Sequence, residues 1–328
     1  MPVRRHAFTL VELLVVIAIL GIMIALVLPA IQSVLESARS SNCRFNLSQL
    51  YLAVKNHRNS KGHYPASFTK DAWSAQTQIL PYLEQKSLQD QFDFQAGYGD
   101  SEFKKTRVAS YMCPSEIHDT PRLKDGEEIH HPLNYVFNLG DWFVYDPATG
   151  DGGQGAFYPF SRLTERNFTD GLTSTICASE AKAYTPYYRN AGKDPSELQL
   201  PGEPSEVEAL ASGAEAKMGA SLMKNTGHTE WVDGRAHQTG FTATFTPNSE
   251  VIVERDGRRY DVDWTNQQEA KSDDKMTYAA VTARSYHVRS VNAVMMGGSV
   301  HSFSDDIDLE VWRALSTRNG GEVTAGKY

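Results

Sequence analysis

Between Glu12 and Glu36 the chain has no charged residue, and this run of 23 residues constrains the fold more than any other sequence feature. As an α-helix rising 1.5 Å per residue it would be roughly 34 Å long, enough to cross the hydrocarbon core of a bilayer. It is longer than the apolar core of a removable secretory signal, which favours a membrane anchor. Arg4 and Arg5 precede it, so we expect the N-terminus in the cytoplasm and the bulk of the chain outside.

Glu12 lies one turn inside the apolar helix, where a carboxylate is unusual. Such a group costs roughly 2.5–3.5 kcal/mol on insertion scales and usually has a partner. No basic residue within the run can serve. An α-amino group exposed at Phe8 by cleavage after Ala7 could serve, either in the same chain or in a neighbouring one.

Residues 4–21, with Phe8 and Glu12 near their start, resemble the class III signal of type IV pilins and type II secretion pseudopilins. The resemblance implies that a prepilin peptidase cuts before Phe8 and methylates the new amine. It also implies that Glu12 pairs with the amine of the next subunit as a fibre assembles. Ala7 stands where that family usually has glycine. The alternative is an uncleaved single-pass anchor.

Beyond the apolar run, the helical pattern becomes amphipathic. Apolar residues recur at spacings of three and four, at Cys43, Leu47, Leu50, Tyr51 and Val54. The pattern predicts one helix from about Thr9 to about Asn59, passing through Pro29 and ended by Gly62 and Pro65. The expected divisions are a leader at 1–7, a transmembrane half at 8–35, an extracytoplasmic half at 36–61 and a head at 62–328.

The head has the composition of a β-rich domain, so we expect an α+β fold. Short β-branched and aromatic runs predict strands at 107–112, 134–139, 174–179, 241–246, 250–254, 277–282, 291–296 and 299–303. The last two flank Gly297-Gly298, a hairpin signal. Helical segments are predicted at 73–92 and from Asp305 to Leu315. An acidic stretch at about 193–217 is interpreted as an exposed loop or insertion.

A second resemblance covers nearly the whole chain and points to the DUF1559 family of pilin-like proteins. Its motifs, in order, lie at residues 42–47, 80–85, 111–115, 134–136, 169–176 and 298–300. The family signature of a histidine, nine residues and Asp-Gly appears here as His287 followed by Gly297-Gly298. With the Asp missing, we interpret His287 as a hydrogen-bonded structural residue rather than a base or ligand. The resemblance implies a fold and a processing route, and no defined biochemical activity.

The three cysteines are Cys43, Cys113 and Cys177. Cys43 lies on the apolar stripe that must meet the head, and Cys113 precedes Pro114 near a predicted turn. We therefore predict a Cys43–Cys113 disulfide, which an extracytoplasmic compartment would preserve. Two separately buried thiols are the alternative. Cys177 is expected in the core.

Three other patterns could carry chemistry, and each has a simpler explanation. Residues 150–155 satisfy G-x-G-x-x-G, but no helix start follows, which favours a turn. The acids Asp305, Asp306 and Asp308 could bind Ca²⁺ but also suit a helix N-terminus. A cluster without a known ligand spacing could hold a metal but is more simply explained as polar residues of a loop; it comprises His228, Glu230, Asp233 and His237. We expect no metal, no cofactor and no enzymatic activity.

The sequence favours a structural subunit, minor or at the tip, of a type IV pilus-like or type II secretion pseudopilus-like filament. Its expected partners are the cytoplasmic membrane, a prepilin peptidase and other pilin-like subunits. Its expected location is the inner membrane, with the head outside and possible display on a cell-surface filament. A net charge of −8 disfavours nucleic acid. The alternative is a tethered binding module that does not polymerise, using loop aromatic residues such as Trp142, Tyr145, Tyr187 and Tyr188.

Overall fold

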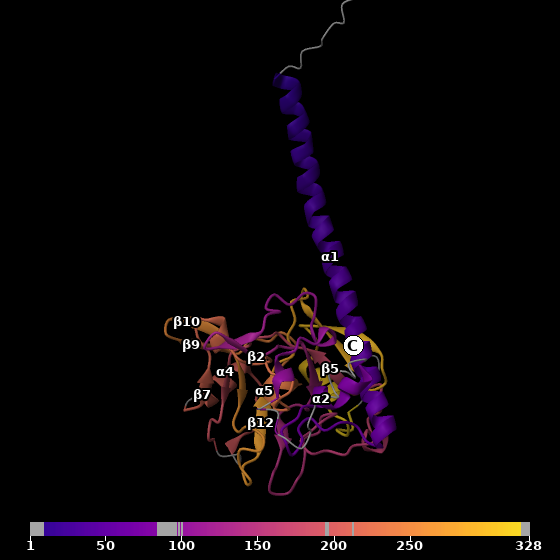
Figure 1. The fold of residues 1–328 in the computed structure, drawn as a ribbon, viewed down its shortest axis with the longest axis vertical. Helices are drawn as coiled ribbons and strands as arrows, with labels where there is room; N and C mark the ends of the chain where they lie inside the picture. Colours follow the sequence, from indigo (N-terminus) through magenta and orange to yellow (C-terminus); the bar gives the residue numbers. More distant parts are fainter. Residues whose placement is uncertain are drawn as a thin grey trace, which may run out of the picture.

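The computed structural model describes residues 10–83, 97, 99, 101–193, 197–211 and 213–322. Within them, one long helix, α1 (Leu10–Lys61), joins a β-rich head (Figure 1). The N-terminal half of α1 projects from the head as a rod, and its C-terminal half lies against the head (Figure 1). The expected α+β class is confirmed.

The end of α1 is set by a glycine. Gly62 has a φ of +82°, and its N–H donates to the carbonyl oxygen of Arg58 at 2.8 Å. This left-handed position favours glycine, because other residues lose roughly 1–2 kcal/mol in it. The helix passes Pro29 without interruption, so both halves of α1 belong to one continuous rod.

The outer half of α1 packs on the head through one face. Its buried positions are Cys43, Leu47, Leu50, Ala53, Val54 and His57. Their spacing of three and four places them on a single stripe, as the sequence predicted. The stripe shares a hydrophobic core with Phe137, Cys177 and Val294 of the adjoining sheet.

That first sheet has five strands in the order β14-β13-β5-β3-β8. Its neighbours are antiparallel except β3 and β8, which are parallel. The strands are β3 (Tyr135–Asn138), β5 (Ile176–Glu180), β8 (Gly240–Phe241), β13 (Ser290–Met295) and β14 (Val300–Ser304).

Side chains of β13 alternate between two cores, because successive residues of a strand point to opposite faces. Val294 joins the core under α1, whereas Val291 and Met295 join a second core with Trp312 of α6 (Leu309–Ser316). The first sheet is therefore covered by α1 on one face and by α6 on the other.

A second five-stranded sheet has the order β4-β12-β11-β6-β7, with β11 and β6 parallel. Its core contains the stacked rings of Trp142 and Trp264, 5.4 Å apart. The strands are β4 (Phe143–Tyr145), β6 (Tyr187–Arg189), β7 (Glu215–Lys217), β11 (Asp263–Thr265) and β12 (Thr277–Ala280). Two separate hairpins pair β1 (Arg122–Lys124) with β2 (Glu127–His130) and β9 (Ile252–Arg255) with β10 (Arg258–Asp261).

Short helices connect the strands. The α-helical ones are α2 (Ala75–Ile79), α4 (Pro204–Leu210) and α5 (Ala236–Thr239). The 3₁₀ turns are η1 (Leu80–Tyr82), η3 (Glu102–Lys105), η4 (Ala109–Tyr111), η5 (Glu165–Asn167) and η7 (Leu222–Lys224). Thus part of the helical segment predicted at 73–92 is present, and residues 84–92 lie outside the described residues.

Two predicted strands differ from the structure. Residues 107–112 form no strand, and Ala109–Tyr111 form the 3₁₀ turn η4, with the Tyr111 hydroxyl donating to the Gln76 carbonyl at 2.6 Å. The strand predicted at 241–246 is reduced to β8, which ends at Phe241. The acidic stretch at 193–217, interpreted as an exposed loop or insertion, contains α4 and β7. Pro204 begins α4, where its missing N–H costs nothing, and Val207 enters the core of the second sheet. At η4 and at α4, packing against the rest of the head outweighs the local composition.

Candidate functional site at the helix–head junction

Of the predicted processing and assembly residues, the structure describes only Glu12. Ala7 and Phe8 lie outside the described residues, and Glu12 lies in the first turn of α1. The helix around Glu12 is exposed in the isolated chain up to residue 35. Among the described residues, α1 is long and apolar enough to cross a membrane.

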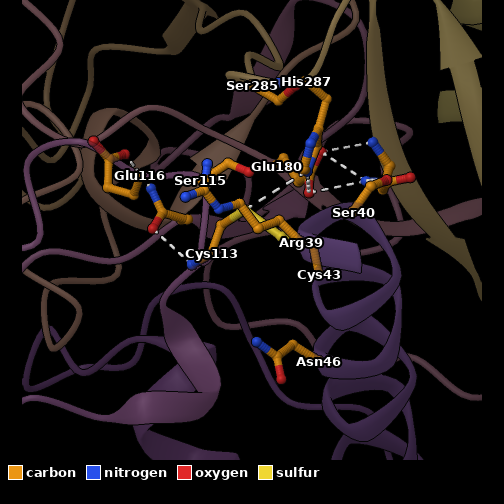
Figure 2. Close-up of a disulfide and its surroundings, with 12 residues drawn as sticks. Arg39, Ser40, Cys43, Asn46, Cys113, Ser115, Glu116, Glu180, Ser285 and His287 are labelled. Carbon is orange, nitrogen blue, oxygen red and sulfur yellow. Dashed lines mark hydrogen bonds and ion pairs between the residues drawn. A yellow bond between two sulfur atoms is a disulfide. The ribbon is translucent and has the colours of Figure 1, made fainter. Parts of the chain in front are cut away.

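A disulfide joins α1 to the head. It links Cys43, on the buried stripe, to Cys113, two residues after η4, and the two Cα atoms are 5.4 Å apart (Figure 2). Cys177 stays a free thiol, and complete burial raises its pKa far above the ordinary value. The link therefore fixes one point of the outer half of α1 to the loop before β3.

His287 lies beside the disulfide and contacts α1 and the first sheet together (Figure 2). Its Nδ1 is 2.6 Å from Glu36 Oε1, on α1. Its Nε2 is 3.1 Å from Glu180 Oε1, at the end of β5, and 3.6 Å from Cys113 Sγ. One imidazole thus bridges two carboxylates that come from different elements.

The carboxylates change the charge state of this imidazole. Burial alone would lower the pKa of His287, but the hydrogen bonds and negative charges of Glu180 and Glu36 outweigh burial and raise it to about 8. At neutral pH the ring is therefore cationic and neutralises part of the charge of the two acids. The junction is held by an ion-pair network as well as by the disulfide.

Neighbouring polar groups orient both acids. The backbone N–H of Asn292 donates to Glu180 Oε2 at 2.7 Å, and its side-chain amide contacts Glu180 and Ser40 of α1. The hydroxyl of Ser115 donates to both oxygens of Glu36 at 3.1 Å. Each carboxylate thus has hydrogen-bond donors from the head, as buried or half-buried charges require.

Gly298, the second residue of the glycine pair that ends the family signature, also lies against α1. Gly298 forms the turn between β13 and β14 with a φ of +95°. A Cβ on Gly298 would lie 2.5 Å from the ring of Tyr51, so a side chain there would require the ring or the hairpin to move. His287 and Gly298 therefore contact α1 at two levels, through Glu36 and through Tyr51.

The sequence alone did not indicate Glu36, Glu180, Asn292 or Tyr51 as parts of this site. The hydrogen-bonding role expected for His287 describes the observed contacts, but its partners were missed. Glu36 offered one signal, because it is the first charge after the apolar run. Glu180 lies 107 residues from His287, and no spacing rule links them.

The glycine-rich segment at 150–155 is a packed turn, as the sequence favoured. A Cβ on Gly155 would lie 2.1 Å from the backbone of Leu139, so two backbone segments touch there. No helix follows it before η5. Dinucleotide binding needs a helix N-terminus at this position, so the structure lacks the context for it.

The four residues of the 228–237 cluster have separate partners rather than one shared centre. His228 bonds the Gln238 carbonyl, Glu230 pairs with Arg122, Asp233 pairs with Arg235, and His237 stacks on Tyr187. Three of the four, His228, Asp233 and His237, are fully buried rather than on an exposed loop. They form polar networks of the head interior.

The acids before α6 also divide among partners. Asp308 caps α6 by accepting from the Val311 N–H at 3.0 Å. Asp305 accepts from the Asn248 side chain at 2.7 Å, and Asp306 pairs with Arg289. The helix therefore begins at Leu309, later than the expected Asp305, because Asp308 is the cap.

The aromatic residues offered for ligand capture lie in the core. Trp142, Tyr145, Tyr187 and Tyr188 are all buried, and each belongs to or precedes a strand of the second sheet. Burial removes the exposed aromatic surface on which the tethered binding module was based.

Comparison with family models gives two matches. Residues 32–310 match the family described as "Protein of unknown function (DUF1559)", and residues 3–28 match the prokaryotic N-terminal methylation motif. No curated protein and no solved structure matches the chain. The methylation motif is that of type IV pilin-like and pseudopilin subunits, and it implies processing by a prepilin peptidase. Because the first match covers most of the sequence, the chain belongs to the DUF1559 family.

Proposed function

We propose that the protein is a non-enzymatic structural subunit of a type IV pilus-like or type II secretion pseudopilus-like filament. One observation carries the proposal. No element in the described part of the chain covers the N-terminal half of α1, although large apolar side chains such as Leu26, 73% exposed, line it. Lipid before assembly, and the same half of other subunits after it, would cover this surface.

Processing would complete the assembly end. Cleavage before Phe8 creates an amine four residues before Glu12, and the acid of one subunit neutralises the amine of the next. Pairing removes two charges from an apolar surrounding, so it favours helices that lie side by side in register. Arg4 and Arg5 keep the uncleaved end in the cytoplasm, which places the head outside the inner membrane.

The junction between α1 and the head would transmit mechanical force between the head and the N-terminal half of α1. In a filament, force on a head reaches the helix bundle only through the outer half of α1. The disulfide, the His287 bridge and the Gly298 turn hold that half at separate levels. A head this large suits a minor or tip subunit better than one repeated along the whole fibre.

Mass spectrometry of the protein from its native host tests the processing step. We expect a mature chain that begins at Phe8 and carries one additional methyl group on its amine. A chain that retains Met1 or the residues up to Ala7 would contradict this step and favour a permanent single-pass anchor.

The substitution Glu12→Val tests assembly. We expect the variant to enter the membrane at least as well as the wild type, because a buried charge is removed, and to be absent from sheared high-molecular-weight surface material. The matched control is Glu310→Val, which removes an acid whose side chain is 81% exposed on the head. Wild-type protein that is never found in sheared material would favour the tethered binding module. Filaments from Glu12→Val would show that the pairing is dispensable.

A further inference from the structure

Four potential metal ligands meet at the junction. Sulfur atoms of Cys43 and Cys113, a carboxylate oxygen of Glu180 and a ring nitrogen of His287 all lie within 4.8 Å of one another, and all four residues are buried. They come from α1, the loop after η4, the end of β5 and the loop before β13. The fold therefore gathers, at one point, ligands that are far apart in sequence.

The donor set matches one class of ion. Two thiolates, one imidazole and one carboxylate suit a tetrahedral Zn²⁺, with metal–ligand distances of about 2.0–2.3 Å. Such a tetrahedron has ligand–ligand edges of roughly 3.3–3.8 Å. The observed distances from His287 Nε2 to Glu180 Oε1 and to Cys113 Sγ are 3.1 and 3.6 Å. Two edges of the tetrahedron are thus close to the required length without movement.

The surroundings resemble the outer shell of a zinc site. A metal-binding histidine usually donates its second ring N–H to a carboxylate, and here His287 Nδ1 faces Glu36 Oε1 at 2.6 Å. Once the ring has lost its Nε2 proton and keeps the proton on Nδ1, the Nε2 lone pair faces the cluster that contains Cys113 Sγ. Glu180 keeps its second oxygen on the Asn292 N–H at 2.7 Å, which leaves Oε1 directed at the cluster. Both ligands are already oriented.

We propose that the chain with reduced Cys43 and Cys113 binds one Zn²⁺ through these two thiolates, His287 Nε2 and Glu180. The disulfide and the metal exclude each other, because bonded sulfurs offer no thiolate. A dithiol donor reduces the disulfide with two electrons and two protons and becomes a disulfide itself. Binding of Zn²⁺ then displaces three protons to solvent, one from each thiol and one from Nε2 of the cationic His287 ring. Oxidation of the thiolates by a disulfide-bearing oxidant removes two electrons, reforms the bond and releases Zn²⁺.

Either state holds α1 on the head at the same place. A newly exported chain has free thiols, so the metal can secure the junction before the disulfide forms. A small cavity lined by Cys113 and Glu180, among others, adjoins the cluster. This inference does not depend on filament formation, since the site lies wholly within one chain.

Metal titration of the full chain in detergent tests the proposal. The protein is reduced with a phosphine, freed of metal with a chelator and titrated with Co²⁺ and then Zn²⁺ without oxygen. We expect one ion per reduced chain and none per oxidised chain. Bound Co²⁺ should show tetrahedral d–d absorption and a thiolate-to-metal charge-transfer band that Zn²⁺ abolishes. A reduced wild type that binds no ion, or Co²⁺ without the thiolate band, would overturn the proposal.

Single substitutions distinguish the proposed zinc ligands from neighbouring residues that do not bind the ion. His287→Gln and Glu180→Gln should abolish stoichiometric binding, and Glu36→Gln should weaken it by about 10–100-fold as an outer-shell change. Cys177→Ala, a matched control at a buried cysteine, should bind like the wild type. Equal binding by His287→Gln would overturn the assignment. Circular dichroism monitors folding, and if the reduced chain unfolds, failure of Zn²⁺ to restore its fold would also count against the site.

Discussion

The two halves of α1 share one continuous backbone but have opposite surroundings. Leu26, in the first half, is 73% exposed, whereas Leu47, in the second, is fully buried. The first half is the more apolar of the two, yet no other part of the described chain covers it. Burial is therefore set by the available partner. The second half has its partner within the chain, and the first half requires lipid or another chain.

The comparison also shows how each half keeps its helical form. In a bilayer every backbone group must be paired within the segment, so the first half is helical even with many Val and Ile residues. The second half depends on side-chain packing on the first sheet and on the links at Cys43 and Glu36. Changes in the head should therefore affect only the second half.

Among the changes considered, loss of the disulfide should most strongly weaken the outer half of α1 relative to the first half. With chelator present, the double substitution Cys43→Ala and Cys113→Ala should lower the free energy of unfolding of the head by about 4 kcal/mol, the chain-entropy value for a closed loop of 70 residues. Urea unfolding followed by tryptophan fluorescence measures it. Hydrogen exchange should show faster exchange in the outer half of α1 and no change before Glu36. Equal acceleration in both halves would contradict the division.

A matched pair of leucines tests packing alone. Leu47→Ala should cost about 3 kcal/mol of head stability, because it leaves a cavity in the core under α1. Leu20→Ala, in the exposed half, should leave head stability unchanged in detergent. The same urea titration measures both variants. Similar losses would show that the first half contributes to the fold of the head.

The smallest expected effect is the pH dependence at the boundary between the halves. The folded-state pKa of His287 is raised to about 8 from its ordinary 6.5, so the stabilisation is complete below about pH 6.5 and is lost as pH rises through 8. With the disulfide intact and no metal, we expect a loss on the order of 1 kcal/mol, discounted because solvent screens the half-exposed Glu36.

Urea unfolding at pH 6 and pH 9 measures this loss, which should shrink in Glu36→Gln because His287 then has one carboxylate partner. Arg39→Ala is the control. Its contact with Glu36 is long, 3.8 Å, and its side chain is exposed, so stability at either pH should change by no more than a few tenths of a kcal/mol. If Glu36→Gln showed a pH dependence as large as that of the wild type, Glu36 would not contribute to the pH-dependent stability that His287 provides.

Local sequence patterns predicted the parts of this molecule that local interactions decide. The stripe from Cys43 to Val54 and the hairpin at Gly297-Gly298 follow from period and turn chemistry, and both match the structure. The Cys43–Cys113 pair could be proposed because only one face of α1 can meet the head. Residues 107–112 have strand composition, but among the described residues they pair with no strand, and Ala109–Tyr111 form a turn.

The site itself could be predicted only in part. His287 stood out through the family resemblance, but its partner Glu36 lies 251 residues away along the chain. His287 and Glu36 meet because α1 packs on the first sheet. A single sequence carries no signal for such a long-range contact. For the same reason, the sequence did not show that His287 and Glu180 lie beside the predicted Cys43–Cys113 pair, because the residues come from different parts of the fold.

The contact between Glu36 and His287 leaves no stalk between the membrane and the head, because Glu36 is also the first charge after the apolar run. Residues 62–328 would form a body with a radius of gyration of roughly 18 Å, or about 45–50 Å across. Packed helices lie only 8–10 Å apart. In the proposed filament, heads of this width could not stand at one height around a tight bundle, so adjacent subunits would be displaced from one another along the fibre axis.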